Sequence, residues 1–414
     1  MRRGTFLFCL TALALQAAGA CAEPVHGRLQ LQDVYAQYGS QSLAAYQGAR
    51  QTNDVLGDAR LTWSPRAGNW NFDFAYVASF DAGDTPRLTR LENSLPILPP
   101  TPPATWWTLT NTFIEHEHFT AMQKIDRLSI GYTSTHFVIR AGRQALTWGA
   151  GLVFRPMDLF DPFAPDATDT EYKPGTDMLY TQYLFDDGSD LQAVIVPRPA
   201  HGNGGLTANA SSFALHYHTQ IGDLQTTWLL ARDHGDMVAG LGVNGSIGGA
   251  TWNAEVVPTF ADGGGTYTSA ILNISDAGKL FDRDIVYFAE YYRNGFGRGT
   301  KHYDLVSLPK PSIDRLLRGQ VFDTGRDYLA IGAQYQWTPL LQISPTLIAN
   351  LDDRSLYALA EATWSLSDNL NLIVGGRLPV GPNGTEFGGI PLLDHLPVYE
   401  EQPARVYIQL RRYF

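Results

Sequence analysis

The sequence predicts an all-β fold, namely a single transmembrane antiparallel β-barrel of about 18 strands, with about 16 as the alternative count. The first observation is a repeated alternation of apolar and polar residues, clearest between Trp70 and Phe80, where every even position is aromatic or alanine. Successive side chains of a strand point to opposite faces, so one face of each such segment is apolar. The other observations are connections that alternate between short and long, and a last segment that ends in an aromatic residue.

The composition supports a membrane barrel over most other classes. Of the 414 residues, 44% are hydrophobic and only 17% are charged, whereas a typical soluble domain has about 25% charged residues. This content excludes a long disordered chain. The net charge of −11 disfavours nucleic acid as a partner. Because no run of 18 apolar residues follows the N-terminal segment, an exported soluble β protein and a membrane barrel remain.

The N-terminal residues have the pattern of a cleaved signal peptide. Arg2 and Arg3 precede an apolar stretch, and Ala20-Cys21-Ala22 forms a cleavage site. We therefore expect residues 1–22 to be removed, which leaves 23–414 as one outer-membrane β-barrel domain. Both cysteines would leave with this leader, so no disulfide or cysteine nucleophile is expected. Lipidation of Cys21 is the alternative.

The strands can be placed from the alternation and from the turn residues between segments. They are expected at 28–38, 54–64, 70–80, 123–133, 136–147, 178–185, 191–197, 211–221, 224–232, 236–246, 251–260, 268–275, 285–294, 327–337, 341–350, 356–366, 369–378 and 405–414. Transmembrane barrels have short periplasmic turns and long extracellular loops. This arrangement puts both termini and every tight turn on the periplasmic side.

The last predicted strand ends the chain on an aromatic residue. Apolar residues at 406, 408 and 410 alternate with polar ones, and the sequence stops at Phe414. This strand resembles the C-terminal strand of bacterial outer-membrane proteins, whose terminal aromatic is read by the barrel-assembly machinery. The resemblance implies that Phe414 is an assembly signal and that the chain lies in the bacterial outer membrane. Expected partners are then the lipid bilayer, lipopolysaccharide, periplasmic chaperones and the barrel-assembly machinery.

The richest candidate site is the loop at 149–176, which we expect to fold into the lumen. It mixes acidic residues with apolar ones that would be exposed to water if the loop extended outward. Alternation puts Arg140 and Gln144 inward and puts Arg143 outward unless a bulge near Gly142 intervenes. Arginines on the wall opposite loop carboxylates would set a transverse field, and the alternative is that they only tie the loop to the wall. The candidates for the pore constriction are Arg140, Arg143, Gln144, Asp158, Asp161, Asp169 and Glu171.

The start of this loop carries a motif, with Gly142-Arg143-Gln144 followed by Trp148-Gly149. It resembles the "GRQ…WG" stretch of porin-like outer-membrane barrels, including alginate-export and related groups. The resemblance covers about 30 residues and implies diffusion or export through a barrel, with Arg143 and Gln144 as the matching positions. It does not imply a substrate.

Other inward side chains give candidates for the lumen lining. The ionisable ones are Glu290, Glu361, Arg377, Arg405 and Arg411. His216 and His218 lie two apart on a strand and would bind a metal only with a third ligand, which the sequence does not identify. We therefore expect no metal and no cofactor.

The function predicted from these features is a porin-like channel that passes small or polymeric solutes through a lumen narrowed by the loop. The alternative is a hydrophobic-compound or polymer exporter, or a surface barrel with a plugged lumen, which the apolar stretches at 95–103 and 152–163 favour. A third and less favoured hypothesis is an outer-membrane hydrolase. Its only local support is Asp233 beside His234, and no G-x-S-x-G motif is present, so the chain is not expected to be an enzyme.

Overall fold

The computed structural model describes residues 23–93, 105–200, 205–304, 308–392 and 397–414. The expected signal peptide and the apolar stretch at 95–103 lie outside the described residues. Within these ranges, no helix is long and apolar enough to cross a membrane.

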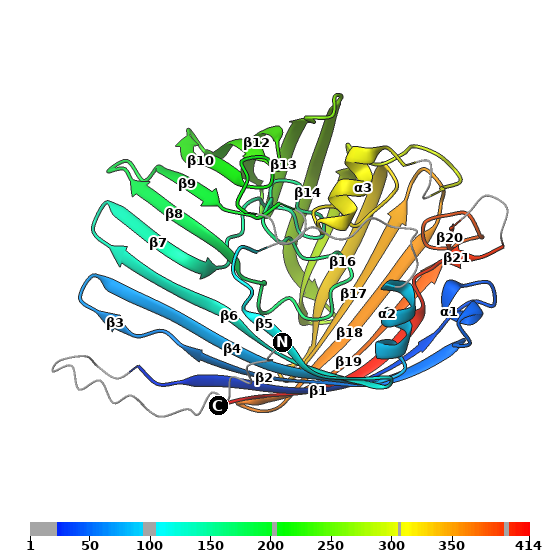
Figure 1. The fold of residues 1–414 in the computed structure, drawn as a ribbon. Coiled ribbons are helices and arrows are strands. Elements are labelled where there is room, and N and C mark those ends of the chain that lie inside the picture. The colour runs from blue at the N-terminus through cyan, green and yellow to red at the C-terminus, as the bar shows by residue number, and fades with distance from the viewer. Residues whose placement is uncertain (1–22, 94–104, 201–204, 305–307, 393–396) are drawn as a thin grey trace.

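Eighteen long strands form a closed antiparallel barrel (Figure 1). They are β1 (His26–Gln37), β2 (Gln51–Trp63), β4 (Trp70–Gly83), β6 (Phe119–Thr133), β7 (Phe137–Gln144), β8 (Thr176–Leu184), β9 (Asp190–Val196), β10 (Ser212–Ile221), β11 (Leu224–Asp233), β12 (Asp236–Ile247), β13 (Ala250–Phe260), β14 (Thr266–Leu280), β15 (Arg283–Arg293), β16 (Asp327–Thr338), β17 (Leu341–Asn350), β18 (Leu356–Ser367), β19 (Leu370–Val380) and β22 (Ala404–Tyr413). Each corresponds to one predicted strand, so the predicted count and order are confirmed.

The barrel closes where the first strand pairs with the last. β1 pairs with β2 on one edge and with β22 on the other. Phe414 extends this seam, because its N–H and C=O bond to the backbone of Gly27 at 3.0 and 2.8 Å. Its ring is 55% exposed and lies over Gly27. The recognition of Phe414 by the assembly machinery stays a prediction.

The outer face of the barrel is apolar, as the alternation predicts. Along the seam, Leu29, Leu31, Ile408 and Leu410 are exposed, while Gln32 between the strand's apolar residues is buried inside. The tryptophans at the turn ends of their strands are also about half exposed, among them Trp70, Trp337 and Trp364. A band of apolar side chains flanked by aromatic residues is the surface that a lipid bilayer requires.

One tight turn lies on the side of the long loops, contrary to the prediction that all tight turns are periplasmic. Asp233 and Asp236 pair across a turn of only two residues, His234 and Gly235. Both central residues have positive φ, at 50° and 90°. Two left-handed residues make a turn whose twist matches that of a hairpin, so no longer loop is needed here.

Several short elements in the connections were not predicted. They are β3 (Arg66–Ala67), β5 (Thr110–His116), β20 (Ile390–Pro391) paired with β21 (Tyr399–Glu400), α1 (Leu43–Tyr46), α2 (Thr85–Asn93) and α3 (Lys310–Leu317). β5 has a clear structural role. β7 ends at Gln144, three residues earlier than predicted, and β5 pairs with the part of β6 that β7 leaves free.

Candidate functional site

The connection between β7 and β8, residues 145–175, is here called the lumen segment, because its contacts are with inward-facing side chains of the wall. Figure 1 shows it as a blue-green coil inside the ring of strands. Five of its apolar side chains are buried there, namely Trp148, Phe154, Met157, Leu159 and Phe160. The predicted fold of this loop, which turns into the barrel and buries its apolar residues there, is therefore confirmed.

Glu290 on β15 anchors the first half of the lumen segment. Its carboxylate is fully buried and accepts hydrogen bonds from three consecutive backbone N–H groups, at 152, 153 and 154, over 2.6, 3.0 and 2.8 Å. Asn273 on β14 donates to the same carboxylate at 3.0 Å and to the carbonyl oxygen of Ala150 at 3.1 Å. Charge-assisted bonds of this kind are stronger than neutral ones. Glu290 was expected to line the lumen. In the structure its carboxylate binds the backbone of residues 152–154 and so attaches the lumen segment to β15.

The second half of the lumen segment reaches another part of the wall, at the seam of β1 and β22. Arg28 contacts Asp169 at 2.7 Å and Glu171 at 3.0 Å, and Arg411 contacts Glu171 at 3.1 Å. The Arg28 side chain is only 5% exposed. Tyr413 adds a hydrogen bond to Glu171 at 2.8 Å. Of the predicted loop carboxylates, Asp169 and Glu171 thus face arginines, but these are the arginines of the seam and not Arg140 or Arg143.

The motif residues at the end of β7 make different contacts. Arg143 is buried and forms a two-point contact with Asp177 on β8, at 2.8 and 3.0 Å. It follows Gly142, which has a φ of 124°, but the pairing of β7 with β6 and with β8 shows no register shift where a bulge was considered. Gln144 is buried and donates to two carbonyl oxygens, and the Arg140 guanidinium lies 4.8 Å from the centre of the Tyr180 ring. These three residues lie where the lumen segment leaves the wall.

Of the two remaining loop candidates, Asp158 holds the lumen segment to itself and Asp161 contacts the start of β8. Asp158 accepts two bonds from Lys173, at 2.6 and 2.7 Å, and Lys173 also donates to the carbonyl oxygen of Leu146. Asp161 accepts a hydrogen bond from Thr176 and has a positive φ of 52°. Asp158 and Lys173 are both buried, so their pairing closes a loop of 15 residues inside the barrel.

The other predicted lumen residues cluster on β18, β19 and β22. Glu361 accepts a hydrogen bond from the Tyr407 hydroxyl at 2.7 Å, and Arg377 lies 5.4 Å from the centre of the same ring. Arg405 lies 3.8 Å from Asp166 of the lumen segment. Arg405 thus adds a further contact to the lumen segment.

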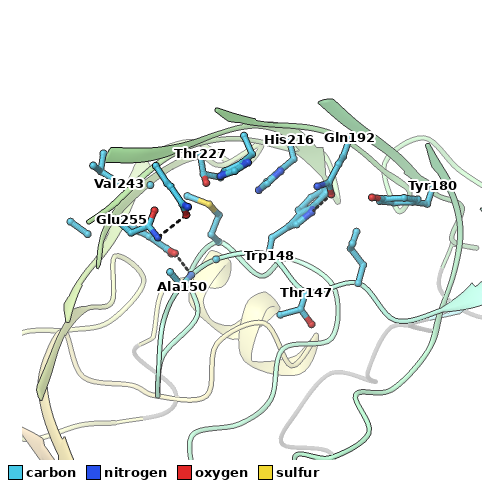
Figure 2. Close-up of a pocket in the computed structure, with 17 residues that line it drawn as sticks. Thr147, Trp148, Ala150, Tyr180, Gln192, His216, Thr227, Val243 and Glu255 are labelled. Carbon is cyan, nitrogen blue, oxygen red and sulfur yellow. Dashed lines mark hydrogen bonds between the residues drawn. The ribbon is translucent and has the colours of Figure 1, made fainter. Parts of the chain in front are cut away.

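A cavity of about 380 Å³ lies between the start of the lumen segment and the wall from β8 to β13. Figure 2 shows Trp148 projecting toward that wall. Its indole stacks on His216 at 4.8 Å and 10°, and its N–H donates to Gln192 at 2.8 Å. Glu255 accepts a bond from the N–H of Ala150. The sequence pattern did not single out Trp148 as a contact residue, nor Gln192 or Glu255.

The two histidines considered as metal ligands lie at this cavity. His216 is buried under Trp148, and His218 lies 3.4 Å from Asp190. In the described part of the chain, no group of three or more His, Cys, Asp or Glu side chains is placed to hold a metal ion.

The Asp233–His234 pair, the only local feature that favoured a hydrolase, belongs to a buried ionic cluster. Asp233 accepts hydrogen bonds from Ser212 and from Gln320, the latter at 2.7 Å, and lies 3.6 Å from Arg198. Burial lowers the pKa of the His234 imidazole to about 3, so His234 is neutral at ordinary pH.

This pKa predicts a loss of stability in acid that depends on His234. A histidine whose folded-state pKa lies below its unfolded value of about 6.5 stabilises the fold above that pH, and the contribution is lost as the pH falls toward 3. Between pH 7 and pH 4 the loss is at most about 3 kcal/mol. We expect His234→Asn, which tolerates the positive φ, to reduce the fall in melting temperature over this range. Circular dichroism melting in detergent would measure it.

His136→Asn provides the matched control, because His136 lies exposed in the turn between β6 and β7. An identical pH profile for wild type and His234→Asn would contradict the prediction.

The comparisons with known proteins identify the fold. No protein-family model matches the sequence, and no curated protein matches it. Among solved structures, OccAB3 of Acinetobacter baumannii superimposes with a TM-score of 0.54 at 9% identity, covering 94% of this chain and 99% of that one. OccK5 (OpdH) of Pseudomonas aeruginosa gives 0.53 at 8% identity, covering 94% and 98%. A BenF-like porin from Pseudomonas fluorescens Pf-5 gives 0.51 at 9% identity, with the same coverage.

At this level of identity the likeness concerns the fold alone. The BenF-like protein is a porin, and porins are channels rather than enzymes. The closed 18-stranded barrel and its apolar outer face agree with a place in the outer membrane. The chain therefore has the fold of bacterial outer-membrane porins.

Proposed function

We propose that the protein is an outer-membrane channel for small polar solutes, and that the lumen segment narrows its passage. The observation that carries the proposal is the attachment of this one segment to widely separated parts of the wall. It bonds to Glu290 on β15 and to Arg28 and Arg411 at the seam of β1 and β22. A segment held at both places crosses the interior, so a solute must pass beside it.

The polar interior supports a water-filled path. Inward-facing positions carry charged and amide side chains, which is the usual lining of a barrel that conducts solutes. The arginines at the seam and the carboxylates of the lumen segment form direct ion pairs at 2.7 and 3.0 Å, so a polar solute would pass beside these paired charges and be oriented by them.

Planar-bilayer recording tests this proposal. The refolded protein is compared with a variant that lacks residues 152–172 and with a control that lacks Gly263 and Gly264 of the β13–β14 loop. We expect discrete conductance steps from the intact protein, larger steps after the 152–172 deletion, and unchanged steps in the control. Absence of steps from every variant that folds would overturn the proposal.

A plugged lumen is the second candidate, and one observation favours it. The extracellular connection that contains α3 also contacts the lumen segment, since Gln320 donates to the carbonyl oxygen of Leu159 at 3.3 Å. Apolar side chains of the lumen segment are buried in two interior clusters. Silence of the intact protein with large steps after the deletion would support an exporter or a plugged barrel.

A further inference from the structure

We propose that the cavity beneath Trp148 binds an uncharged, polyhydroxylated solute of about the size of one or two sugar rings. The proposal rests on the proposed function, because it names the class of solute that the channel would select. The volume of about 380 Å³ lies at the lower end of the range of small-molecule pockets.

The lining of the cavity is polar but almost without charge. Its side chains include the carboxamides of Gln192, Gln225 and Asn244 and the hydroxyls of Thr147 and Thr227. Among the described residues that line it, none is Lys or Arg, and the only carboxylate is Glu255. An anion would find no permanently charged partner there, and His218 already lies 3.4 Å from Asp190. Amides and hydroxyls, by contrast, pair readily with the hydroxyl groups of a neutral solute.

Two buried atoms in this lining have no hydrogen-bond partner among the residues that the structure describes. They are Nδ1 of His216 and Oε2 of Glu255. Leaving such atoms unpaired is costly, which favours a ligand that completes their bonding. A hydroxyl both donates and accepts, so it can pair with either tautomer of the imidazole and with the carboxylate oxygen. A cation could pair with Glu255 only.

Two features of β11 and β12 shape the cavity, namely a facing pair of carboxamides and a glycine. Gln225 and Asn244 face each other across β11 and β12, close to the short turns of these strands. At Gly242, an added Cβ would already be in ordinary van der Waals contact with Thr227, Met157 and Glu255, at 3.4 Å or more. A large side chain there would fill the cavity. The arginines that hold the lumen segment lie instead on the seam of β1 and β22.

Sugar block of the ion current tests the inference. Glucose and sucrose are added to the bilayer chamber, with gluconate and choline as anionic and cationic probes. We expect both sugars to reduce the current saturably, at lower concentration than either charged probe. Asn244→Leu should raise the half-blocking concentration at least tenfold, and Gly242→Phe should abolish block. Gln342→Leu on β17, which replaces an inward amide outside the cavity, should leave block unchanged.

A second measurement separates failure of the inference from failure of the proposed function. Equilibrium dialysis of radiolabelled glucose and sucrose against the detergent-purified protein reports binding whether or not the barrel conducts. Saturable binding that Gly242→Phe removes supports the site even in a silent barrel. Channels that conduct but show neither sugar block nor sugar binding would overturn the inference, as would saturable block by choline or gluconate with none by sugars.

Discussion

Glu290→Ala is expected to release the first half of the lumen segment and to enlarge the conductance of the barrel. The substitution leaves the three N–H groups at 152–154 and one N–H of Asn273 without an acceptor in a buried place. Each unsatisfied buried donor costs roughly 1–3 kcal/mol, so the segment would lose most of its attachment to β15. The barrel wall itself should persist, because its strands keep their backbone ladders. Single-channel recording would detect larger or more variable steps.

Limited proteolysis provides a second readout for this variant. Cleavage within residues 152–172 should become faster than in the wild type, while the barrel stays resistant. Glu361→Ala is the matched control, since Glu361 is also an inward carboxylate but bonds to Tyr407 and Thr363 of the wall. Unchanged steps and unchanged cleavage in Glu290→Ala would show that Glu290 does not hold the segment.

The strands could be predicted from the sequence because each carries its own evidence. A strand in a membrane wall needs apolar residues at every second position, and its turn needs particular residues, so both signals are local. The unpredicted β5 lacks such a signal. It forms because β7 ends at Gln144 and leaves the edge of β6 open, which only the pairing of the three strands reveals.

The candidate site could likewise be predicted only where the signal is local. The composition of residues 149–176 predicted that the loop turns inward, since its apolar residues need burial. Its partners could not be predicted, because they lie far away in the chain. Leu152 and Glu290 are 138 positions apart, and Arg28 and Glu171 are 143 apart. Alternation predicts which side chains face the lumen, but it does not predict which of them meet across it.

Arg28 is such a residue, because its partner Glu171 lies 143 positions away in the chain. Replacing Arg28 is the second change for which we expect a large effect. Arg28 contacts Asp58, Asp169 and Glu171, at 3.1, 2.7 and 3.0 Å. Its guanidinium also lies 4.9 Å from the centre of the Tyr172 ring. Removing one partner of a fully buried ion pair costs about 3–5 kcal/mol, and here the cost is smaller, because the carboxylates are 18–27% exposed and Arg411 still contacts Glu171. We therefore expect Arg28→Met to weaken the attachment of residues 169–172 to the seam.

For Arg28→Met, the weaker attachment should appear as increased conductance and as a lower melting temperature. Arg28→Lys should restore both only in part, because an ammonium group cannot reproduce the forked contacts of a guanidinium. Arg412→Met is the matched control, since Arg412 neighbours Arg411 on β22 but alternates to the outer face. If Arg28→Met and Arg412→Met behaved alike, Arg28 would not be the attachment point. If only the melting temperature fell, Arg28 would stabilise the barrel without controlling its passage. The two readouts therefore distinguish an arginine that closes the seam from one that positions the lumen segment.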